Sequence, residues 1–338
     1  MKFRRKVILA KIEAGGYGVD AAPVAATDAM LVRNFQFRPL QLQYEDREFD
    51  VPYFGNKGRI VAGQFGAMSF EVEVAGAGGA VDAVPKYGPL LRACGMSQTV
   101  NAAVSVVYAP ITTAEESASM YFYLDGRLQK MLGSLGNVTL RIAAGRIPVY
   151  AFEFIGLHVQ PTDVALPTPT LTGFTKPVAV NKANTTPFTL HAFSGNFREL
   201  TITTGNVLPY RNLPNSEAIR FVDRKAMGSI RLEKELVAAK DWETLIKAGT
   251  LGALACTQGT VAGNKVAIAA ANVQLTEPEE TEEVAASFDR PGFVPDRGEG
   301  TLPPAARRFL GPDGALRIRP EEAPGLDGFF AMRWRRGG

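Results

Sequence analysis

The chain has 338 residues, and 37 lysines and arginines oppose 34 aspartates and glutamates, for a net charge of +3. Hydrophobic residues make up 46% and charged residues 21% of the chain, a balance that supports a folded core and excludes a wholly disordered protein. A dedicated nucleic-acid-binding protein would carry a larger or clustered basic excess, so tight phosphate binding is not expected.

Hydrophobic and polar residues alternate along much of the first 275 positions, which predicts β-strands. Within Ser69–Val74, for example, Phe70, Val72 and Val74 share one face. The same pattern recurs at Val138–Ile142, at Ile147–Ile155 after a turn at Ala143–Arg146, at Leu200–Thr203 and at Ser229–Glu233. Strands with one polar face belong to antiparallel sheets, so we predict a mainly β (α+β) fold built of β-sandwich or half-barrel units.

Helical spacing occurs in two short segments. Tyr87–Gly95 places Leu90, Leu91 and Cys94 on one face and ends at a glycine. Lys240–Gly249 has the stronger signal, with Asp241 as the capping residue. In each half of the chain an alternating strand therefore precedes a short helix, and more strands follow. This shared order predicts that the two halves carry the same fold, each with one flanking helix.

Composition divides the chain into three regions. The proline-containing stretch Val164–Leu171 is expected to be an extended connection. It separates a first domain, residues 1–165, from a second, residues 166–275. Residues 276–338 are rich in proline, glycine, arginine and acidic residues, and we expect a loosely ordered extension. Within it, only Ala315–Arg319 and Phe329–Trp334 are expected to pair as strands.

Residues that could carry chemistry are few. The two histidines, His158 and His191, lie in strand patterns and are expected to be hydrogen-bonded structural residues. Cys94 and Cys256 are far apart in sequence and are predicted to be free and buried. We therefore predict no enzyme activity, no catalytic residue, no cofactor and no metal site. No stretch reaches the roughly 18 apolar residues of a membrane span, so no membrane partner is expected.

Several segments, in this order along the chain, resemble tail tube proteins of siphophages and related prophages. They are Arg5-Lys-Val-Ile-Leu-Ala-Lys-Ile-Glu-Ala14, Tyr17-Gly-Val-Asp20, Asp28-Ala-Met-Leu-Val-Arg33, Met120-Tyr-Phe-Tyr-Leu-Asp-Gly126, Gly136-Asn-Val-Thr-Leu140, Gly145-Arg-Ile-Pro148, Phe152-Glu-Phe-Ile-Gly156, Asp223-Arg-Lys225, Gly228-Ser-Ile-Arg-Leu232 and Gly249-Thr-Leu-Gly-Ala253. The resemblance covers roughly residues 4–275. Residues 276–338 have no clear counterpart, and are either a decoration or the product of a reading-frame change near residue 285.

The resemblance implies a structural subunit of the virion tail, synthesised and assembled in the host cytoplasm. Such subunits form stacked rings around a channel for DNA ejection. A trimer of chains with two tube domains each would have pseudo-sixfold symmetry. The implied partners are other copies of the chain, the tape-measure protein, and the tail terminator and tail-tip proteins. Genomic DNA would pass through the lumen without specific binding, and we expect a neutral or negative lumen.

Ring stacking requires segments that leave the body of the subunit, and two long connections have a suitable composition. Residues 44–59 and 205–213 combine aromatic and charged side chains. The predicted contact residues between rings are Arg47, Phe49, Tyr53, Phe54, Lys57, Arg59, Tyr210 and Arg211. The alternative for both connections is a surface loop packed within its own chain.

Two other functions fit a chain of this kind. A carbohydrate- or receptor-binding β-sandwich tail protein would be a monomer or small oligomer with exposed aromatic residues at one loop end. The tube of a contractile secretion system is a nearer competitor, but its subunits usually have half this length and a single domain.

Overall fold

The computed structural model describes residues 5–55, 57–233, 235–276 and 278, and the backbone of four short strands between residues 293 and 336. The chain divides into two units, Met1–Thr276 and Glu277–Gly338. Strands dominate the first unit, and the described residues contain two helices of one to two turns. The predicted mainly β fold class is confirmed.

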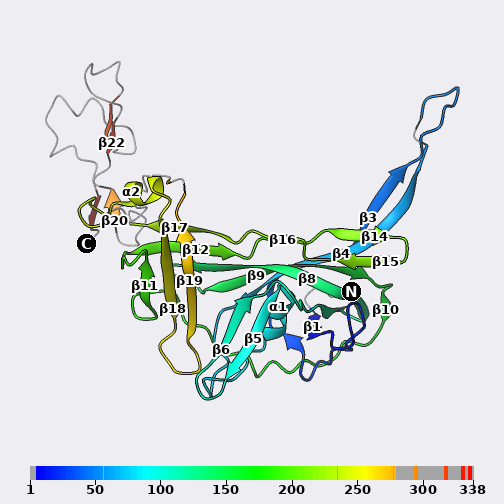
Figure 1. Ribbon diagram of the computed structural model, residues 1–338, viewed down its shortest axis with the longest axis horizontal. Coiled ribbons are helices and arrows are strands. Elements are labelled where there is room, and N and C mark those ends of the chain that lie inside the picture. The colour runs from blue at the N-terminus through cyan, green and yellow to red at the C-terminus, as the bar shows by residue number, and fades with distance from the viewer. Residues whose placement is uncertain are drawn as a thin grey trace. The chain divides into compact units, whose positions relative to one another are not determined.

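The first half of the Met1–Thr276 unit is built around a large antiparallel sheet with the strand order β2-β1-β7-β8-β9-β4-β3 (Figure 1). Its elements are β1 (Lys6–Ile12), β2 (Ala29–Met30), β3 (Arg33–Asp46), β4 (Arg59–Glu73), α1 (Gly88–Ala93), β5 (Met96–Asn101), β6 (Ser105–Pro110), β7 (Ala118–Leu124), β8 (Arg127–Ala143), β9 (Val149–His158) and β10 (Thr162–Asp163). Strands β5 and β6 form a separate hairpin. The predicted turn at Ala143–Arg146 connects β8 to β9, which pair as antiparallel neighbours.

The second half contributes a smaller three-stranded sheet, β11-β18-β19, and a long hairpin. Its elements are β11 (Thr185–Leu190), β12 (Phe197–Thr203), β13 (Asn206–Val207), β14 (Tyr210–Leu213), β15 (Ser216–Ile219), β16 (Asp223–Arg224), β17 (Met227–Leu232), α2 (Trp242–Lys247), β18 (Leu251–Gln258) and β19 (Val266–Gln274). Strands β12 and β17 pair at the base of the hairpin, and the pairs β13–β16 and β14–β15 continue it outward.

Strand β8 joins the two halves. It pairs with β7 near its start, with β9 along most of its length, and with β12 at its end, where Thr139–Ala143 face Glu199–Thr203. The hairpin of the second half therefore extends the sheet of the first. The expected boundary between residues 165 and 166 lies inside the Met1–Thr276 unit, and the division into two tail-tube domains stays a prediction.

The same connectivity nevertheless occurs twice, as the sequence predicted. A long hairpin, β3–β4 or β12–β17, is followed by a short helix, α1 or α2. A second hairpin then follows, β7–β8 or β18–β19, whose first strand pairs with the strand that opens the half, β1 or β11. The halves differ in two respects. The first half has the additional hairpin β5–β6 between its helix and β7. In the first half β9 lies between β8 and β4, whereas no described strand joins β19 to β17.

The strands form because their alternating apolar side chains share a core. Phe70 and Val72 of β4, and Val74 just after its end, are each at most 2% exposed, as the alternation predicted. Phe70 packs against Phe152 and Phe154 of β9, with ring centroids 5.8 and 5.9 Å apart. A second core lies between the sheet and β11-β18-β19, so both halves bury an apolar face.

Both predicted helices are present. Helix α1 starts beside a proline, buries Leu90 and Leu91 in the first core, and ends before Gly95, whose φ is +75°. Helix α2 is capped as predicted: Oδ1 of Asp241 accepts a hydrogen bond from the backbone N–H of Thr244 at 2.9 Å.

In the Glu277–Gly338 unit the structure describes four strand segments in two antiparallel pairs. Strand β21 (Leu316–Ile318) pairs with β22 (Phe329–Ala331), which confirms the pairing predicted from the sequence. Strand β20 (Phe293–Pro295) pairs with β23 (Trp334–Arg336), which the sequence did not predict. We expected loose order across residues 276–338, and most of the other residues of this range lie outside the described part of the chain.

Candidate assembly surfaces

The outer part of the β3–β4 hairpin projects beyond the rest of its unit, and we call residues 44–61 the first arm (Figure 1). The last paired residues are Asp46 and Arg59, and the loop between them, residues 47–58, forms the tip of the arm. The β3–β4 ladder changes register at three places, which twists the hairpin as it leaves the body.

The tip exposes the aromatic side chains that the sequence predicted as contact residues. Phe54 is fully exposed, Tyr53 is 70% exposed and Phe49 is 49% exposed. Large apolar side chains gathered on a protruding segment have no partner to bury them within the described chain. This combination is typical of an interaction surface.

The base of the tip is stabilised by its own charged residues. Nε of Arg59 lies 2.6 Å from a carboxylate oxygen of Asp46, and its guanidinium lies 5.9 Å from the ring of Tyr44. The guanidinium of Arg47 lies 4.6 Å from the ring centroid of Phe49. The structure therefore places Arg47 and Arg59 in contacts within the arm, while Phe54 extends past them.

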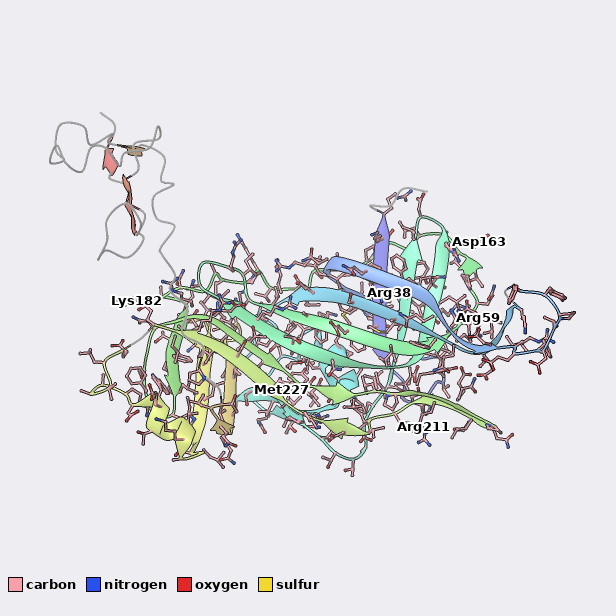
Figure 2. All side chains as sticks on the ribbon, turned by 90° about the horizontal axis from the view of Figure 1, so that it is seen from above. Arg38, Arg59, Asp163, Lys182, Arg211 and Met227 are labelled. Carbon is pink, nitrogen blue, oxygen red and sulfur yellow. The ribbon has the colours of Figure 1, made fainter. Side chains whose placement is uncertain are left out.

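The outer part of the β12–β17 hairpin, residues 204–226, forms a second arm, which extends from the same end of the unit as the first arm (Figures 1 and 2). Tyr210, on this arm, packs on the first: its ring lies 5.0 Å from that of Phe65, and its hydroxyl accepts a hydrogen bond from the N–H of Gln64. The same hydroxyl donates to Glu217, and burial together with this carboxylate raises the pKa of Tyr210.

Of the eight predicted contact residues, the structure brings six together on the first arm and two on the second. Arg211 is exposed, whereas Tyr210 is committed to a contact within its own chain. A role between rings for all eight residues stays a prediction.

The root of the second arm is fixed by a network that the sequence did not predict. Asn206 is 6% exposed, and its Nδ2 donates to the carbonyls of Cys94 and Gly136. The Arg224 guanidinium donates to Oδ1 of Asn206 at 2.7 Å and to the carbonyl of Gly95 at 2.9 Å. The arm is therefore anchored to the C-terminal end of α1. Asn206 and Arg224 are more than 100 residues from the Cys94 and Gly95 carbonyls that they bind, so no local pattern signals the network.

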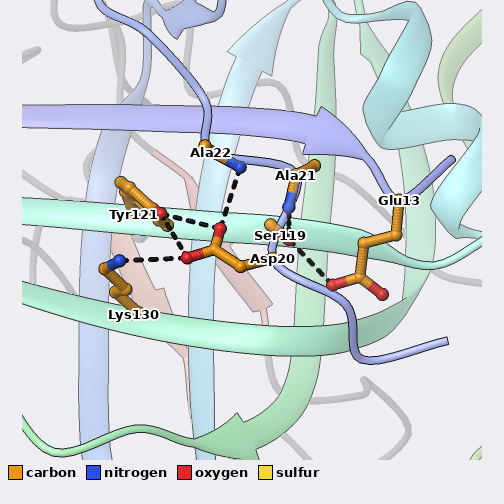
Figure 3. A network of polar contacts seen from close by, with 7 residues as sticks. All are labelled: Glu13, Asp20, Ala21, Ala22, Ser119, Tyr121 and Lys130. Carbon is orange, nitrogen blue, oxygen red and sulfur yellow. Dashed lines mark hydrogen bonds and ion pairs between the residues drawn. The ribbon is translucent and has the colours of Figure 1, made fainter. Parts of the chain in front are cut away.

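The N-terminal loop is held on β7 and β8 by two carboxylates, one of which is buried (Figure 3). Glu13 is 8% exposed and accepts hydrogen bonds from the hydroxyls of Ser117 and Ser119 and from the N–H groups of Gly18 and Gly133. All four donors point at one side chain, so its burial is fully compensated.

Asp20 is the second of these carboxylates and is partly exposed. It accepts hydrogen bonds from the hydroxyl of Tyr121, the N–H of Ala22 and the ammonium of Lys130 (Figure 3). Burial opposes ionisation, but these donors outweigh it and lower the pKa of Asp20. These hydrogen bonds of Asp20 hold the N-terminal loop against β7 and β8.

Besides the two-residue strands β2 and β10, two strands of the main sheet have a free edge among the described residues. Along the path β3-β4-β9-β8-β12-β17, β3 pairs with β4 alone and β17 with β12 alone, among the described residues. Free edges carry rows of unpaired N–H and C=O groups that favour pairing with another strand.

Comparison with known families decides the identity. Residues 4–289 match the family model of the phage tail tube protein. The chain belongs to the phage tail tube protein family. This match continues past residue 275, where the resemblance seen in the sequence ended. No curated protein matches the chain.

As a member of this family, the tail tube protein is a structural component of the virion tail, and its copies assemble into a tube. Its two histidines are bonded to the main chain: Nδ1 of His158 lies 2.9 Å from the carbonyl of Pro39, and Nε2 of His191 lies 2.9 Å from that of Val273. Both are structural contacts, as expected.

Cys94 and Cys256 of the tail tube protein are free and buried, which confirms the prediction. Burial raises the pKa of both thiols, that of Cys256 to about 11. Among the described residues no three potential metal ligands gather. No helix in the described part of the chain is long and apolar enough to cross a membrane.

Proposed function

We propose that this tail tube protein forms closed rings that stack into the channel for DNA ejection. The observation that carries the proposal is the free edge of β3 in the first half together with the free edge of β19 in the second, among the described residues. A ring of copies pairs these two edges at every junction, which an isolated subunit cannot do.

The repeat within the chain supports a trimer with pseudo-sixfold symmetry. Strand β12 of the second half corresponds to β3 of the first, because each opens a long hairpin that precedes a helix. Within the chain, β12 pairs with the end of β8. The junction between chains then follows the same rule, with β3 receiving a strand from the second half of a neighbouring copy.

Further partners follow from the tube itself. The tape-measure protein fills the lumen before ejection, and the terminator and tail-tip proteins close the two ends. DNA passes through without specific binding. The assembly belongs to a long-tailed, siphovirus-type phage and takes place in the host cytoplasm.

Negative-stain electron microscopy of the purified protein over a concentration series tests the proposal. We expect rings and hollow tubes of uniform bore, and a ring mass of three chains of 36.4 kDa, about 109 kDa, by light scattering. Small particles that persist at high concentration would contradict it and favour a receptor-binding β-sandwich protein.

A further inference from the structure

A pocket of about 270 Å³ opens between the edge strand β3 and the strands β1, β7 and β8, and we call it the edge pocket. Its floor is aromatic: Phe35 and Phe37 of β3 lie 4.5 and 5.3 Å from the ring centroid of Phe122 on β7. Leu124 completes the apolar lining. The pocket has the size and chemistry to receive an aromatic side chain.

Two basic side chains line the same pocket. The ammonium of Lys6 lies 5.8 Å from the ring centroid of Phe35, and Arg127 lies at the start of β8. Within the described residues neither of them forms an ion pair with a carboxylate. An occupant with both an aromatic group and a negative charge would satisfy the floor and these two cations together.

The tip of the first arm has this chemistry. Tyr53 and Phe54 are exposed there, and both lie around the same shallow hollow as the carboxylate of Asp50. Asp50 and the nearby Glu48 form no ion pair with any described residue. The aromatic and acidic groups of the tip thus complement the aromatic floor and basic rim of the edge pocket.

An arm cannot fill the pocket of its own chain. The pocket includes Pro39, and the β3–β4 ladder continues to the pair Asp46–Arg59 before the tip begins. The seven residues of β3 from Leu40 to Asp46 span roughly 23 Å at about 3.3 Å per residue. The hairpin therefore holds the tip away from its own pocket, and the occupant must come from another copy.

We propose that the tip of the first arm inserts into the edge pocket of a second copy in the next ring, an inference that rests on the proposed stacking. Phe54 packs on the aromatic floor, and the Asp50 carboxylate faces Lys6 and Arg127. Because the arm and the pocket are different surfaces of one chain, the contact is heterologous and repeats from ring to ring.

Charge reversal tests the pairing. Asp50→Lys and Arg127→Glu should each raise the critical concentration for tubes at least about tenfold, and the double variant should return it to within about threefold of wild type. Lys182→Glu is the matched control, since it reverses an exposed charge outside both the arm and the edge pocket and should leave tubes intact. Sedimentation and electron microscopy read out rings and tubes separately.

Either of two results overturns the inference: single variants that polymerise at the wild-type concentration, or a double variant that remains as separate rings. A wild-type protein that forms no rings would instead refute the proposed function. The two failures are therefore distinguishable.

Cross-linking gives an independent measurement. In tubes that carry Tyr53→Cys and Leu124→Cys together, oxidation should join neighbouring copies into a covalent ladder, while tubes with either cysteine alone should give none. Cys94 and Cys256 are both buried and do not compete. Tubes of the double-cysteine protein that yield no ladder would contradict the contact.

Discussion

Two buried serines on neighbouring strands differ in their hydrogen bonds. Ser119 on β7 and Ser134 on β8 are both completely buried. The hydroxyl of Ser119 donates to Glu13 and accepts from the N–H of Ala21. The hydroxyl of Ser134 is the one buried polar side-chain atom in the described residues without a partner. A buried hydroxyl without a partner lowers stability, so the two positions should respond oppositely to truncation.

We predict that Ser134→Ala raises the free energy of unfolding by up to about 1 kcal/mol, because it removes an unsatisfied group. Ser119→Ala should lower it by about 1–2 kcal/mol, because it removes one of the four donors to the buried Glu13 carboxylate and the acceptor of the Ala21 N–H. Urea unfolding monitored by circular dichroism measures both. Equal losses in the two variants would contradict the assignment.

The pKa of Asp20 leads to a prediction about pH. Since the folded-state pKa lies below the ordinary value of 3.8, the bonds to Asp20 stabilise the protein above that value. This stabilisation is lost as the pH falls through the folded-state pKa. Asp20→Asn should therefore destabilise the protein at neutral pH, and the difference from wild type should vanish in acid. Asp163→Asn, an exposed position, is the control for thermal melts across the series.

The anchor of the second arm depends on a single amide. Asn206→Ala removes hydrogen bonds to two carbonyls and leaves the guanidinium of Arg224 without one acceptor. We expect a loss of about 2–4 kcal/mol in the free energy of unfolding. Hydrogen exchange should also become faster in residues 204–226. Asn212→Ala, on the same arm but exposed and with one bond to Ala62, should cost less than about 1 kcal/mol.

At the scale of elements, local chemistry predicted strands and helices well. Alternation at Ser69–Val74 and the cap at Asp241 each correspond to the observed element, because both signals arise from neighbours in sequence. The aromatic tip of the first arm was also predicted. Asn206 and Glu13 were not, since their partners come from distant strands. The docking of Tyr210 on Phe65 was missed for the same reason.

The free edge of β3 can be tested with two adjacent proline substitutions. Neighbouring residues in an antiparallel strand point their N–H groups to opposite sides. Gln41 and Leu42 pair in continuous register with β4, so one N–H faces β4 and the other faces outward. Of the variants Gln41→Pro and Leu42→Pro, the one that removes the N–H facing β4 should lose about 3 kcal/mol in the free energy of unfolding. The one that removes the outward N–H should fold normally but form no rings.

Chemical unfolding and electron microscopy of these two variants separate the effects. The destabilised member of the pair serves as the control for the loss of a hydrogen bond within the chain. If the variant that folds normally still forms rings, β3 is not the ring edge.

At the scale of the whole molecule, the near-neutral charge limits its affinity for DNA. A tube that neutralised many phosphates would hold the genome by releasing counterions, and a net charge of +3 on 338 residues provides little of that attraction. We predict that assembled tubes retain no duplex DNA at about 0.15 M salt. Co-sedimentation of labelled DNA measures this, with the same tubes at low salt as the comparison. DNA that pellets with the tubes at the higher salt would contradict a neutral or negative lumen.

The pairing of β8 with β12 has a consequence for synthesis. On the side of β8 that faces away from β9, residues 139–143 pair with residues 199–203. When the first half has emerged from the ribosome, the edge of β8 that later binds β12 is therefore still unpaired. This edge can pair with a strand of another nascent chain on the same messenger RNA. Pauses in translation between these two segments would prolong the time for which the β8 edge is unpaired. The yield of correctly folded subunits should therefore decrease as such pauses become longer.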